Sequence, residues 1–261
     1  MKKFELWQGD CLELMKNIPD GSVDLTVTSP PYDNLRTYNG NINQWNFEKF
    51  KDIAKELYRV TADGGVVVWI DADATIKGSE TGTSFRQALW FMDCGFNLHD
   101  TMIYAKANPM PCKSKRYTPA FEYMFVFSKG QPKTFNPIME DCKFAGKKSA
   151  RTVIYADGTR KHYNKGFYKD TKGKRNVFEY NVGTGKGRGI KHPAVFPEQL
   201  ANDHIVSWSN DGDTVLDCFM GSGTTGKMAV LNNRRFIGFE LDEGYFNIAK
   251  KRIEEAVNDL P

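Results

Sequence analysis

A glycine-rich turn near the C-terminal end of the chain most strongly constrains the fold. Gly221, Gly223 and Gly226 form a G-x-G-x-x-G pattern between an expected strand and an expected helix. Glu240 follows 19 residues after Gly221, at the end of the next expected strand. Such glycines let the backbone approach a ligand at a helix N-terminus, and the acid can accept hydrogen bonds from ribose hydroxyls. The pattern predicts a nucleoside-cofactor site, with a purely structural turn as the alternative.

The position of this turn in the chain predicts the topology. In a nicotinamide-binding Rossmann domain the glycine turn normally opens the sheet, and several strand–helix units follow it. Here only one strand and one helix remain after it. The other strands must therefore come from the N-terminal half, so we expect a circularly permuted sheet built from both ends of the chain. A dinucleotide and S-adenosylmethionine both present an adenosine ribose, so the turn alone leaves the cofactor open.

Hydrophobic patterning predicts a doubly wound α/β fold with a mostly parallel sheet. Three strand–helix units fit within residues 1–70, which favours parallel strands. Two later strands have no helix between them and are expected to form an antiparallel pair at the edge of the sheet. The expected strands are 4–8, 23–27, 66–70, 97–106, 121–127, 214–219 and 235–240, and the expected helices are 12–18, 47–60, 85–94, 198–208, 227–231 and 245–257.

Residues 130–190 lack any periodicity long enough to predict a core element. Between Lys143 and Lys191 there are fourteen Lys or Arg against three acids, a local charge of +11, whereas the rest of the chain has a charge of −7. Aromatic residues are interleaved with these cations, a pattern that suits phosphate contacts and base stacking. We interpret the segment as a polyanion-binding region, with a solvated charged loop as the alternative.

Composition excludes several classes of protein. A chain of 261 residues with 40% hydrophobic residues can form one large domain, or a core with an insertion, and is not globally disordered. The five cysteines are dispersed without metal-ligand spacing, so we expect free thiols, a reducing compartment and no metal site. The N-terminus lacks the apolar region of a signal peptide, and no apolar run reaches the ~20 residues that span a bilayer. These features predict a cytoplasmic protein with no membrane partner.

A second motif, Thr28-Ser29-Pro30-Pro31-Tyr32, follows the strand expected at 23–27. The two prolines stop both helix and sheet and hold the backbone extended. A hydroxyl, an acceptor-only carbonyl and an aromatic ring therefore lie at the carboxyl end of a strand, where open α/β sheets bind ligands. The alternative is a turn with an exposed tyrosine.

Together these motifs resemble the β class of amino-group DNA methyltransferases, in which a catalytic motif precedes a target-recognition segment and then the S-adenosylmethionine loop. The matching stretches are Gly9-Asp10, Thr28–Tyr32, Tyr117–Lys129, Lys191–Leu200, Asp217–Thr224 and Phe239-Glu240. The resemblance covers nearly the whole chain, although residues 130–190 match nothing residue by residue. It implies a Rossmann-like, circularly permuted fold with a catalytic half at 1–130, an inserted target-recognition region at 131–190 and a cofactor-binding half at 191–261.

The resemblance assigns roles to individual residues. It implies that Asp10 contacts the adenine amino group of S-adenosylmethionine, that Glu240 binds the ribose, and that Asp217 binds the ammonium group. The full set implied to bind the cofactor is Asp10, Thr28, Asp217, Phe219, Gly221, Gly223, Thr224 and Glu240. As structural alternatives, Asp217 caps the glycine turn and Phe219 belongs to the core.

The resemblance places catalysis at Ser29, Pro30, Pro31 and Tyr32. If Ser29 Oγ and the Pro30 carbonyl accept the amino hydrogens of a flipped base, the lone pair of its nitrogen can face the methyl donor. Tyr32 would stack on that base, which must leave the duplex to be reached. Within the family, Ser at this position is more typical of cytosine-N4 enzymes and Asp of adenine-N6 enzymes.

We therefore predict a site-specific, S-adenosylmethionine-dependent DNA methyltransferase that acts on cytosine N4 in double-stranded DNA. The nearest alternative keeps the mechanism and acts on adenine N6 or, more distantly, on RNA. Further alternatives are a nicotinamide-dependent oxidoreductase and a DNA-binding module without turnover. A second copy of the chain and a cognate restriction endonuclease are the protein partners that such an enzyme could have.

Overall fold

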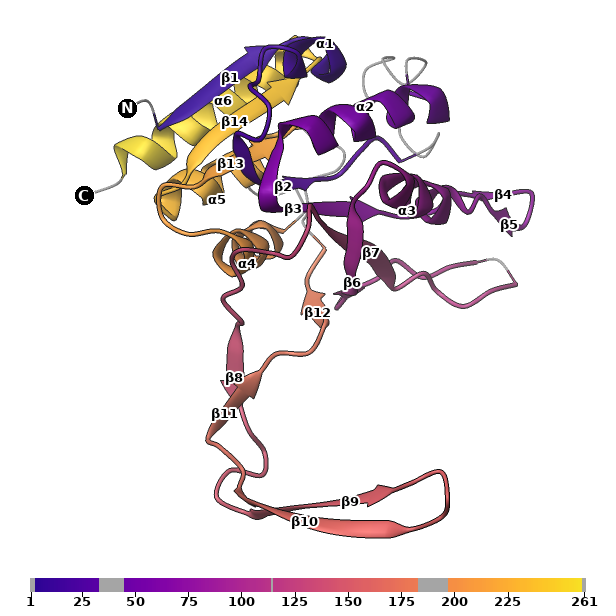
Figure 1. Cartoon of the computed structure of the whole chain (residues 1–261). Helices are drawn as coiled ribbons and strands as arrows, with labels where there is room; N and C mark the ends of the chain where they lie inside the picture. The colour runs from indigo at the N-terminus through magenta and orange to yellow at the C-terminus, as the bar shows by residue number, and fades with distance from the viewer. Residues whose placement is uncertain (1–2, 33–44, 114, 183–196, 260–261) are drawn as a thin grey trace. The chain divides into compact units, whose positions relative to one another are not determined.

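A computed structural model describes residues 3–32, 45–113, 115–182 and 197–259 (Figure 1). The chain divides into two compact units, one formed by Met1–Asn136 with Asn176–Pro261 and the other by Pro137–Arg175. The Asn-rich stretch at 33–43 and most of the stretch expected to pack over the methionine moiety, 191–196, lie outside the described residues.

The larger unit is built on one eight-stranded sheet. Its strand order is β1-β14-β13-β2-β3-β7-β6-β12. In that order the strands are Phe4–Gln8, Arg235–Glu240, Thr214–Asp217, Val23–Thr28, Thr61–Asp71, Phe121–Ser128, Asn97–Lys106 and Val177–Tyr180. The two C-terminal strands β13 and β14 lie between the N-terminal strands β1 and β2, and all of these neighbours are parallel. This confirms a doubly wound, mostly parallel sheet built from both ends of the chain.

The antiparallel part of the sheet differs from the expectation. β7 is antiparallel to both of its neighbours, β3 and β6, and is interior, while β6 pairs on its other side with β12 in parallel. The edge strand is thus β12, a core strand in a region where no core element was expected. Its residues Phe178 and Tyr180 are buried. A strand of four residues is too short to show a hydrophobic periodicity in the sequence. As an edge strand, β12 pairs with β6 alone.

The structure differs from two other predictions about local conformation. Asp63-Gly64-Gly65, expected to be a turn before β3, lies within β3 at an irregularity of its register with β2. The polar segment after β3, expected to be a loop, contains the short hairpin of β4 (Thr75–Ile76) and β5 (Ser79–Glu80). In both places glycines with positive φ, Gly64 and Gly78, allow the chain to change direction over a few residues.

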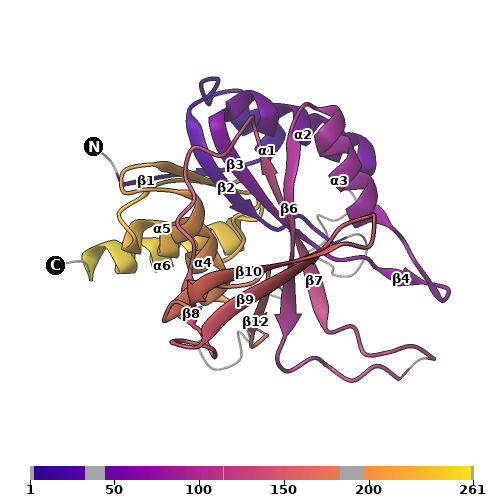
Figure 2. The same cartoon turned by 60° about the horizontal axis from the view of Figure 1, so that its bottom comes forward.

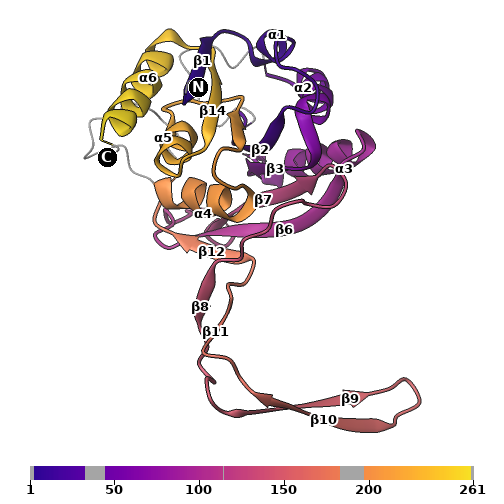
Figure 3. The ribbon, with the colours of Figure 1, turned by 60° about the vertical axis from the view of Figure 1, so that its left-hand side comes forward.

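The six helices found among the described residues of the larger unit cover the two faces of this sheet (Figure 3). Helices α1, α2 and α3 lie on one face and α4, α5 and α6 on the other. Their bounds are Cys11–Met15, Phe47–Val60, Thr83–Asp93, Glu198–Trp208, Thr224–Leu231 and Glu243–Asn258. None of the described helices has the length and apolar character needed to cross a membrane.

The core follows from the apolar stripes of the helices. Helix α2 begins where Asn46 Oδ1 accepts a hydrogen bond from Lys49 N, and it buries the stripe expected from its sequence, including Phe50. The Phe50 ring lies 5.7 Å from that of Trp69 on β3 and 5.4 Å from that of Phe91 on α3. These contacts pack the carboxyl-terminal part of β3 against α2 and α3.

The smaller unit consists of β-strands joined by irregular chain. Strands β8 (Met139–Asp141) and β11 (Thr171–Gly173) form one antiparallel pair (Figure 1). Strands β9 (Lys148–Ile154) and β10 (Arg160–Phe167) form a hairpin (Figure 2). Most of its aromatic side chains are exposed, among them Phe144, Tyr155 and Tyr168. Such exposed rings among cations do not form a core of their own.

Candidate active site

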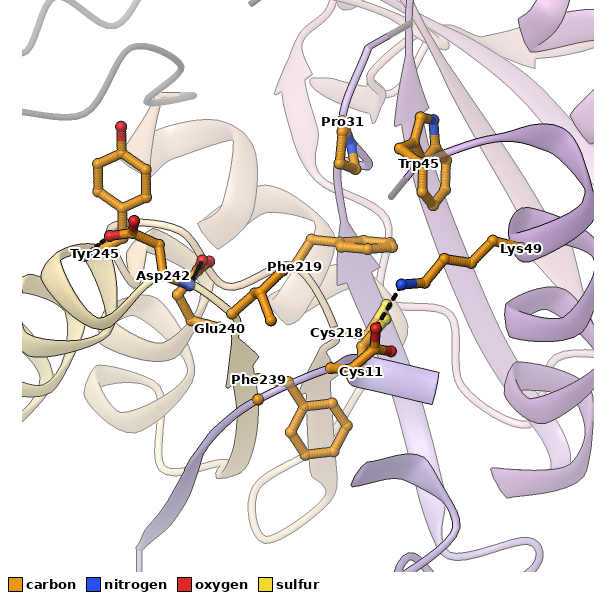
Figure 4. A pocket seen from close by; sticks show the side chains of 13 residues that line it. Cys11, Pro31, Trp45, Lys49, Cys218, Phe219, Phe239, Glu240, Asp242 and Tyr245 are labelled. Carbon is orange, nitrogen blue, oxygen red and sulfur yellow. Dashed lines mark hydrogen bonds and ion pairs between the residues drawn. The ribbon is translucent and has the colours of Figure 1, made fainter. Parts of the chain in front are cut away.

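The carboxyl ends of β1, β2, β13 and β14 meet at one edge of the larger sheet and border a pocket (Figure 4). About 660 Å³ of empty space, part of it open to solvent, lies between the residues that line the pocket. Aromatic side chains and carboxylates line it together. In Figure 4, Phe219 lies between Glu240, Asp242 and Tyr245 on one side and Pro31, Trp45 and Lys49 on the other.

Glu240 joins the glycine turn to the pocket. Its Oε2 accepts a hydrogen bond from the backbone N–H of Gly221 at 2.8 Å, and its Oε1 accepts one from Asp242 N at 2.8 Å. Burial raises the pKa of Glu240, and these two hydrogen bonds act in the opposite direction. Each carboxylate oxygen retains a further lone pair, so the side chain can still accept from ligand hydroxyls.

The glycines of this turn meet distinct steric demands. Gly221 and Gly223 have φ values of 52° and 77°, in the region that glycine favours. Gly226 packs so closely that an added Cβ would lie 2.5 Å from side-chain atoms of Phe236 and Ile253. The turn therefore needs these glycines both for its conformation and for the packing of α5.

We expect the substitution Gly223→Ala to lower the free energy of unfolding by about 2–4 kcal/mol, from the left-handed backbone and from overpacking. An added Cβ would lie 2.9 Å from both Cα and Cβ of Ala249, and backbone atoms cannot move aside cheaply. Gly212→Ala is a matched control, because Gly212 has a φ of 83° with no atom within 4 Å of the added Cβ. Urea denaturation measures the free energy of unfolding of both variants. Equal losses in the two variants would contradict the steric clash.

Asp10 begins helix α1 and faces the pocket. Its Oδ1 accepts from Leu12 N at 2.9 Å, and its Oδ2 pairs with Lys49 Nζ at 2.5 Å. Lys49 belongs to the first turn of α2 and was not among the predicted site residues. Its sequence carries no signal of this role, because a lysine in the first turn of a helix resembles any surface charge until the fold places it beside Asp10.

Thr28 and Asp217 lie behind the pocket, at the ends of neighbouring strands. Thr28 Oγ1 donates to Asp217 Oδ1 at 2.7 Å, and Phe219 N donates to the same oxygen at 3.1 Å. Both side chains are buried, and neither lines the pocket. Burial raises the pKa of Asp217 to about 6, although hydrogen bonds from Thr28 and Thr225 oppose the shift.

The raised pKa of Asp217 predicts a pH dependence of stability. The folded pKa exceeds the unfolded value of 3.8, so the folded state binds more protons between pH 4 and 6 and its stability falls as pH rises through that window. We expect Asp217→Asn to remove this slope, which approaches about 1.4 kcal/mol per pH unit for one group. Urea denaturation of both proteins from pH 4 to pH 7 measures the difference. Parallel curves would contradict the assignment.

The Ser29 corner forms a hydrogen-bond chain of its own. Ser29 Oγ donates to Tyr32 OH at 2.9 Å, and Tyr32 OH donates to Glu122 Oε2 at 2.9 Å. Glu122 Oε1 in turn pairs with Lys106 Nζ at 2.9 Å. Pro30 and Tyr32 are buried, so the alternative of an exposed tyrosine on a turn is wrong. Pro31 lines the pocket, which connects this corner to it.

Glu122 lies between Phe121 and Tyr123 in the stretch Tyr117–Lys129 and was not among the predicted site residues. Alternation along β7 points these two side chains to the opposite face of the sheet from Glu122. The Tyr123 ring lies 5.2 Å from that of Phe85 on α3 and 5.1 Å from that of Phe125. Tyr123 therefore contributes to packing under α3, and the acidic residue between the two aromatics faces Tyr32.

The predicted site residues fall into three groups in the described structure. Asp10, Pro31, Phe219 and Glu240 line the pocket. Ser29 and Tyr32 form the chain to Glu122, next to buried Pro30. The remaining residues do not line the pocket. Thr28 and Asp217 lie at the strand ends, and Gly221, Gly223 and Thr224 form the turn into α5, where Thr224 Oγ1 accepts a hydrogen bond from Arg252 Nη1 at 3.4 Å. Fold and site together define a Rossmann-like protein with a pocket at the carboxyl ends of its parallel strands, beside a polar, proline-stiffened corner.

Comparison with known proteins identifies the family. Residues 23–251 match the DNA methylase family of N6 and N4 methyltransferases. The orphan methyltransferase M.BamHII of Bacillus amyloliquefaciens is 50% identical, over 94% of this chain and 93% of its own. Among solved structures, the PvuII DNA methyltransferase, described as cytosine-N4-specific, is similar with a TM-score of 0.72 and 23% identity over 99% of this chain and 92% of its own. M1.HpyAVI in complex with S-adenosylmethionine has a TM-score of 0.63 and 22% identity over 96% of this chain and 98% of its own.

The chain belongs to this family of amino-group DNA methylases. It is a DNA methyltransferase of the N4/N6 amino type, and its cofactor is S-adenosylmethionine. The family membership confirms the enzyme class inferred from the motif order, and the alternative of a nicotinamide-dependent oxidoreductase is set aside.

Proposed function

We propose that this enzyme transfers a methyl group from S-adenosylmethionine to the N4 amino group of a cytosine flipped out of duplex DNA. The observation that carries the base choice is a serine at position 29, where adenine enzymes of the family typically have an aspartate. Its hydroxyl hydrogen is directed to Tyr32, which leaves the oxygen lone pairs available to an amino group. Adenine N6 is the alternative substrate of the same mechanism.

The residues that line the pocket, together with Asp217 outside its lining, match the cofactor in charge and in hydrogen-bonding capacity. Asp10 has acceptor capacity for the adenine amino group, and Glu240 has it for the ribose hydroxyls. Phe219 lies at the pocket centre, where its ring can pack on the ligand. Asp217, buried and with a raised pKa, would gain a cationic partner in the ammonium group. Bound S-adenosylmethionine supplies an electrophilic methyl group at a sulfonium centre.

The protein residues prepare the acceptor nitrogen. An exocyclic amino group is conjugated into the base and is a poor nucleophile. When Ser29 Oγ and the Pro30 carbonyl accept its two hydrogens, the nitrogen can become pyramidal and turn its lone pair towards the methyl donor. Because the prolines fix the backbone, the carbonyl needs no reorganisation during the reaction. Stacking on the Tyr32 ring, worth ~1–3 kcal/mol in comparable cases, would hold the base, and flipping costs a few kcal/mol.

The experiment that tests the base choice uses unmethylated duplex DNA and S-adenosylmethionine labelled in its methyl group. After transfer, the DNA is digested to nucleosides and these are separated. We expect the label in N4-methyldeoxycytidine. Label in N6-methyldeoxyadenosine alone would contradict the cytosine assignment and support the alternative. Sequencing DNA from an expressing host with a method that detects N4-methylcytosine then gives the target sequence.

Residues 131–190 are the region to which we assign target recognition. Support comes from the smaller unit within it, where cations and exposed aromatic rings alternate. Lys147 Nζ lies 5.5 Å from the Phe144 ring centroid, and Lys161 Nζ lies 5.4 Å from that of Tyr163. Where cations bind phosphates, the affinity for DNA falls as the salt concentration rises. Where rings stack on bases, the affinity depends much less on salt. Measuring the affinity for DNA against salt concentration tests the electrostatic part.

The partners and the location of the enzyme are proposals of the same kind. An exposed apolar face on α3, formed by Phe85, Leu89 and Met92, is where we would expect a second copy of the chain to dock. The mass measured by sedimentation velocity distinguishes a monomer from a dimer. The relative M.BamHII is named an orphan methyltransferase, which supports action without a cognate restriction endonuclease. A cytoplasmic location follows from the proposed DNA substrate and stays a prediction.

A further inference from the structure

We propose that Glu122 is a positioning residue that makes Ser29 an acceptor-only group by fixing the direction of the Ser29–Tyr32–Glu122 hydrogen-bond chain. This inference rests on the proposed function, because it concerns Ser29 as the acceptor of an amino hydrogen. It adds to the site a residue on β7, a strand that contains neither the glycine turn nor the Thr28–Tyr32 motif.

The need for such a residue follows from the chemistry of a serine hydroxyl. A hydroxyl has one hydrogen to donate and two lone pairs to accept with, and its hydrogen rotates towards the best available acceptor. The amino group of a base presents hydrogens, so a Ser29 hydrogen directed at it would oppose binding. An aspartate in this position has no hydrogen when ionised and needs no such control. A serine therefore requires a second group that takes its hydrogen away from the substrate.

Tyr32 takes that hydrogen, and Glu122 keeps Tyr32 able to do so. Tyr32 OH accepts from Ser29 Oγ at 2.9 Å while donating its own hydrogen to Glu122 Oε2 at 2.9 Å. An ionised carboxylate can only accept, so it sets the direction of every hydrogen bond before it in the chain. Without that acceptor the tyrosine hydroxyl could turn and donate to Ser29, which would then point its own hydrogen at the substrate.

The surroundings hold the chain in this state. Glu122 Oε1 pairs with Lys106 Nζ at 2.9 Å, and only 14% of the Glu122 side-chain surface and 21% of that of Lys106 are exposed. This pairing from neighbouring strands β6 and β7 compensates the partly buried carboxylate. Burial, followed by the charge of Glu122, raises the pKa of Tyr32 well above its ordinary value, so the tyrosine keeps the hydrogen that it donates. The hydrogen bonds also polarise one another, which strengthens Ser29 Oγ as an acceptor.

The test compares methyl-transfer rates of the full-length enzyme in single turnovers, with unmethylated genomic DNA and labelled S-adenosylmethionine. Glu122→Gln nearly preserves shape but adds an N–H₂ donor, so the direction of the chain is no longer set. We expect a loss of about tenfold or more in rate, since a misdirected preorganised group weakens transition-state stabilisation. The affinity for S-adenosylmethionine should stay within about twofold, because the chain does not line the pocket. Glu255→Gln, at an exposed ion pair with Lys251, is the matched control and should match the wild type.

A second comparison separates positioning from a merely structural role. If Glu122 acts through Ser29, then Glu122→Gln should change the residual rate of a Ser29→Ala enzyme by no more than about twofold. The reason is that the effects of two coupled residues do not add. A structural role would lower the rate by the same factor in both backgrounds, and that result would overturn the proposal. Wild-type turnover by Glu122→Gln would also overturn it.

Two further arms keep the result unambiguous. Tyr32→Phe removes one oxygen and keeps the ring, so it tests the same chain if Glu122→Gln does not fold. We expect a loss of about tenfold or more there as well, and an unchanged rate would overturn the proposal. The product nucleoside is identified in the same reactions. Labelled N6-methyldeoxyadenosine would refute the cytosine assignment alone, whereas N4-methyldeoxycytidine with full activity of Glu122→Gln would refute the role of Glu122 alone.

Discussion

Replacing Ser29 by alanine is expected to lower the rate of methyl transfer by about 100- to 1,000-fold, the usual cost of removing one preorganised hydrogen-bonding group from a transition state. The loss follows from the acceptor chemistry of the corner. Without Ser29 Oγ, one amino hydrogen of the target base has no partner, and the nitrogen lone pair stays conjugated into the ring. The Pro30 carbonyl and the stiff backbone remain, so some activity persists.

The same substitution should leave cofactor binding unchanged. Ser29 does not line the pocket, and its described hydrogen bond goes to Tyr32. Calorimetric titration with S-adenosylmethionine should therefore give a dissociation constant within about twofold of the wild type, which assigns the loss to the chemical step. Ser22→Ala, at the opposite end of the same strand, is the control, since Ser22 Oγ bonds only Pro19 O among described contacts. A Ser29→Ala enzyme with near-normal turnover would exclude the acceptor role.

Replacing Glu240 by alanine is expected to weaken S-adenosylmethionine binding by about 100-fold or more. Two effects combine. The ribose loses its acceptor, and the N–H groups of Gly221 and Asp242 lose theirs, each a charge-assisted hydrogen bond worth about 1.5–3 kcal/mol. The glycine turn would then no longer be held against the end of β14. We therefore expect a lower free energy of unfolding as well as weaker binding.

Glu243→Ala is the matched control for Glu240→Ala. Glu243 is an exposed glutamate in the first turn of α6, three residues further along the chain. Its removal changes the charge by the same amount and should alter the dissociation constant by no more than about twofold. Calorimetry with S-adenosylmethionine measures affinity, and urea denaturation measures stability. Unchanged affinity in Glu240→Ala, with or without lower stability, would remove Glu240 from the cofactor site.

The fold was largely predictable because its main signals are local. Apolar stripes, turn residues and the glycine pattern each predict an element from neighbouring residues, and the order of the motifs predicts a sheet built from both ends of the chain. The parts that were wrong depend on partners distant in sequence. Whether β6 or β7 lies against β3, and whether Val177–Tyr180 joins the sheet, is decided by which edge offers free hydrogen-bonding groups and an apolar surface.

The residues of the site also divide into those with a local sequence signal and those whose role depends on a partner distant in the chain. Ser29, Asp10, Glu240 and the glycine turn belong to contiguous motifs whose residue types reveal their chemistry. Lys49 and Glu122 do not, because a charged residue on a helix or a strand resembles any other solvent-facing charge until the fold gives it a partner. Lys49 meets Asp10 across 39 residues of chain, and Glu122 meets Tyr32 across 90.

The motifs and their order in the sequence predict the class of fold and, through their resemblance to a known family, the chemistry of the enzyme. The charged groups that act on the motif residues are known only from the folded structure, because these contacts join strands and helices that are distant in the chain. At the Ser29 corner this difference is physical. The motif supplies a hydroxyl that can donate or accept, and the folded sheet supplies the carboxylate that directs its hydrogen.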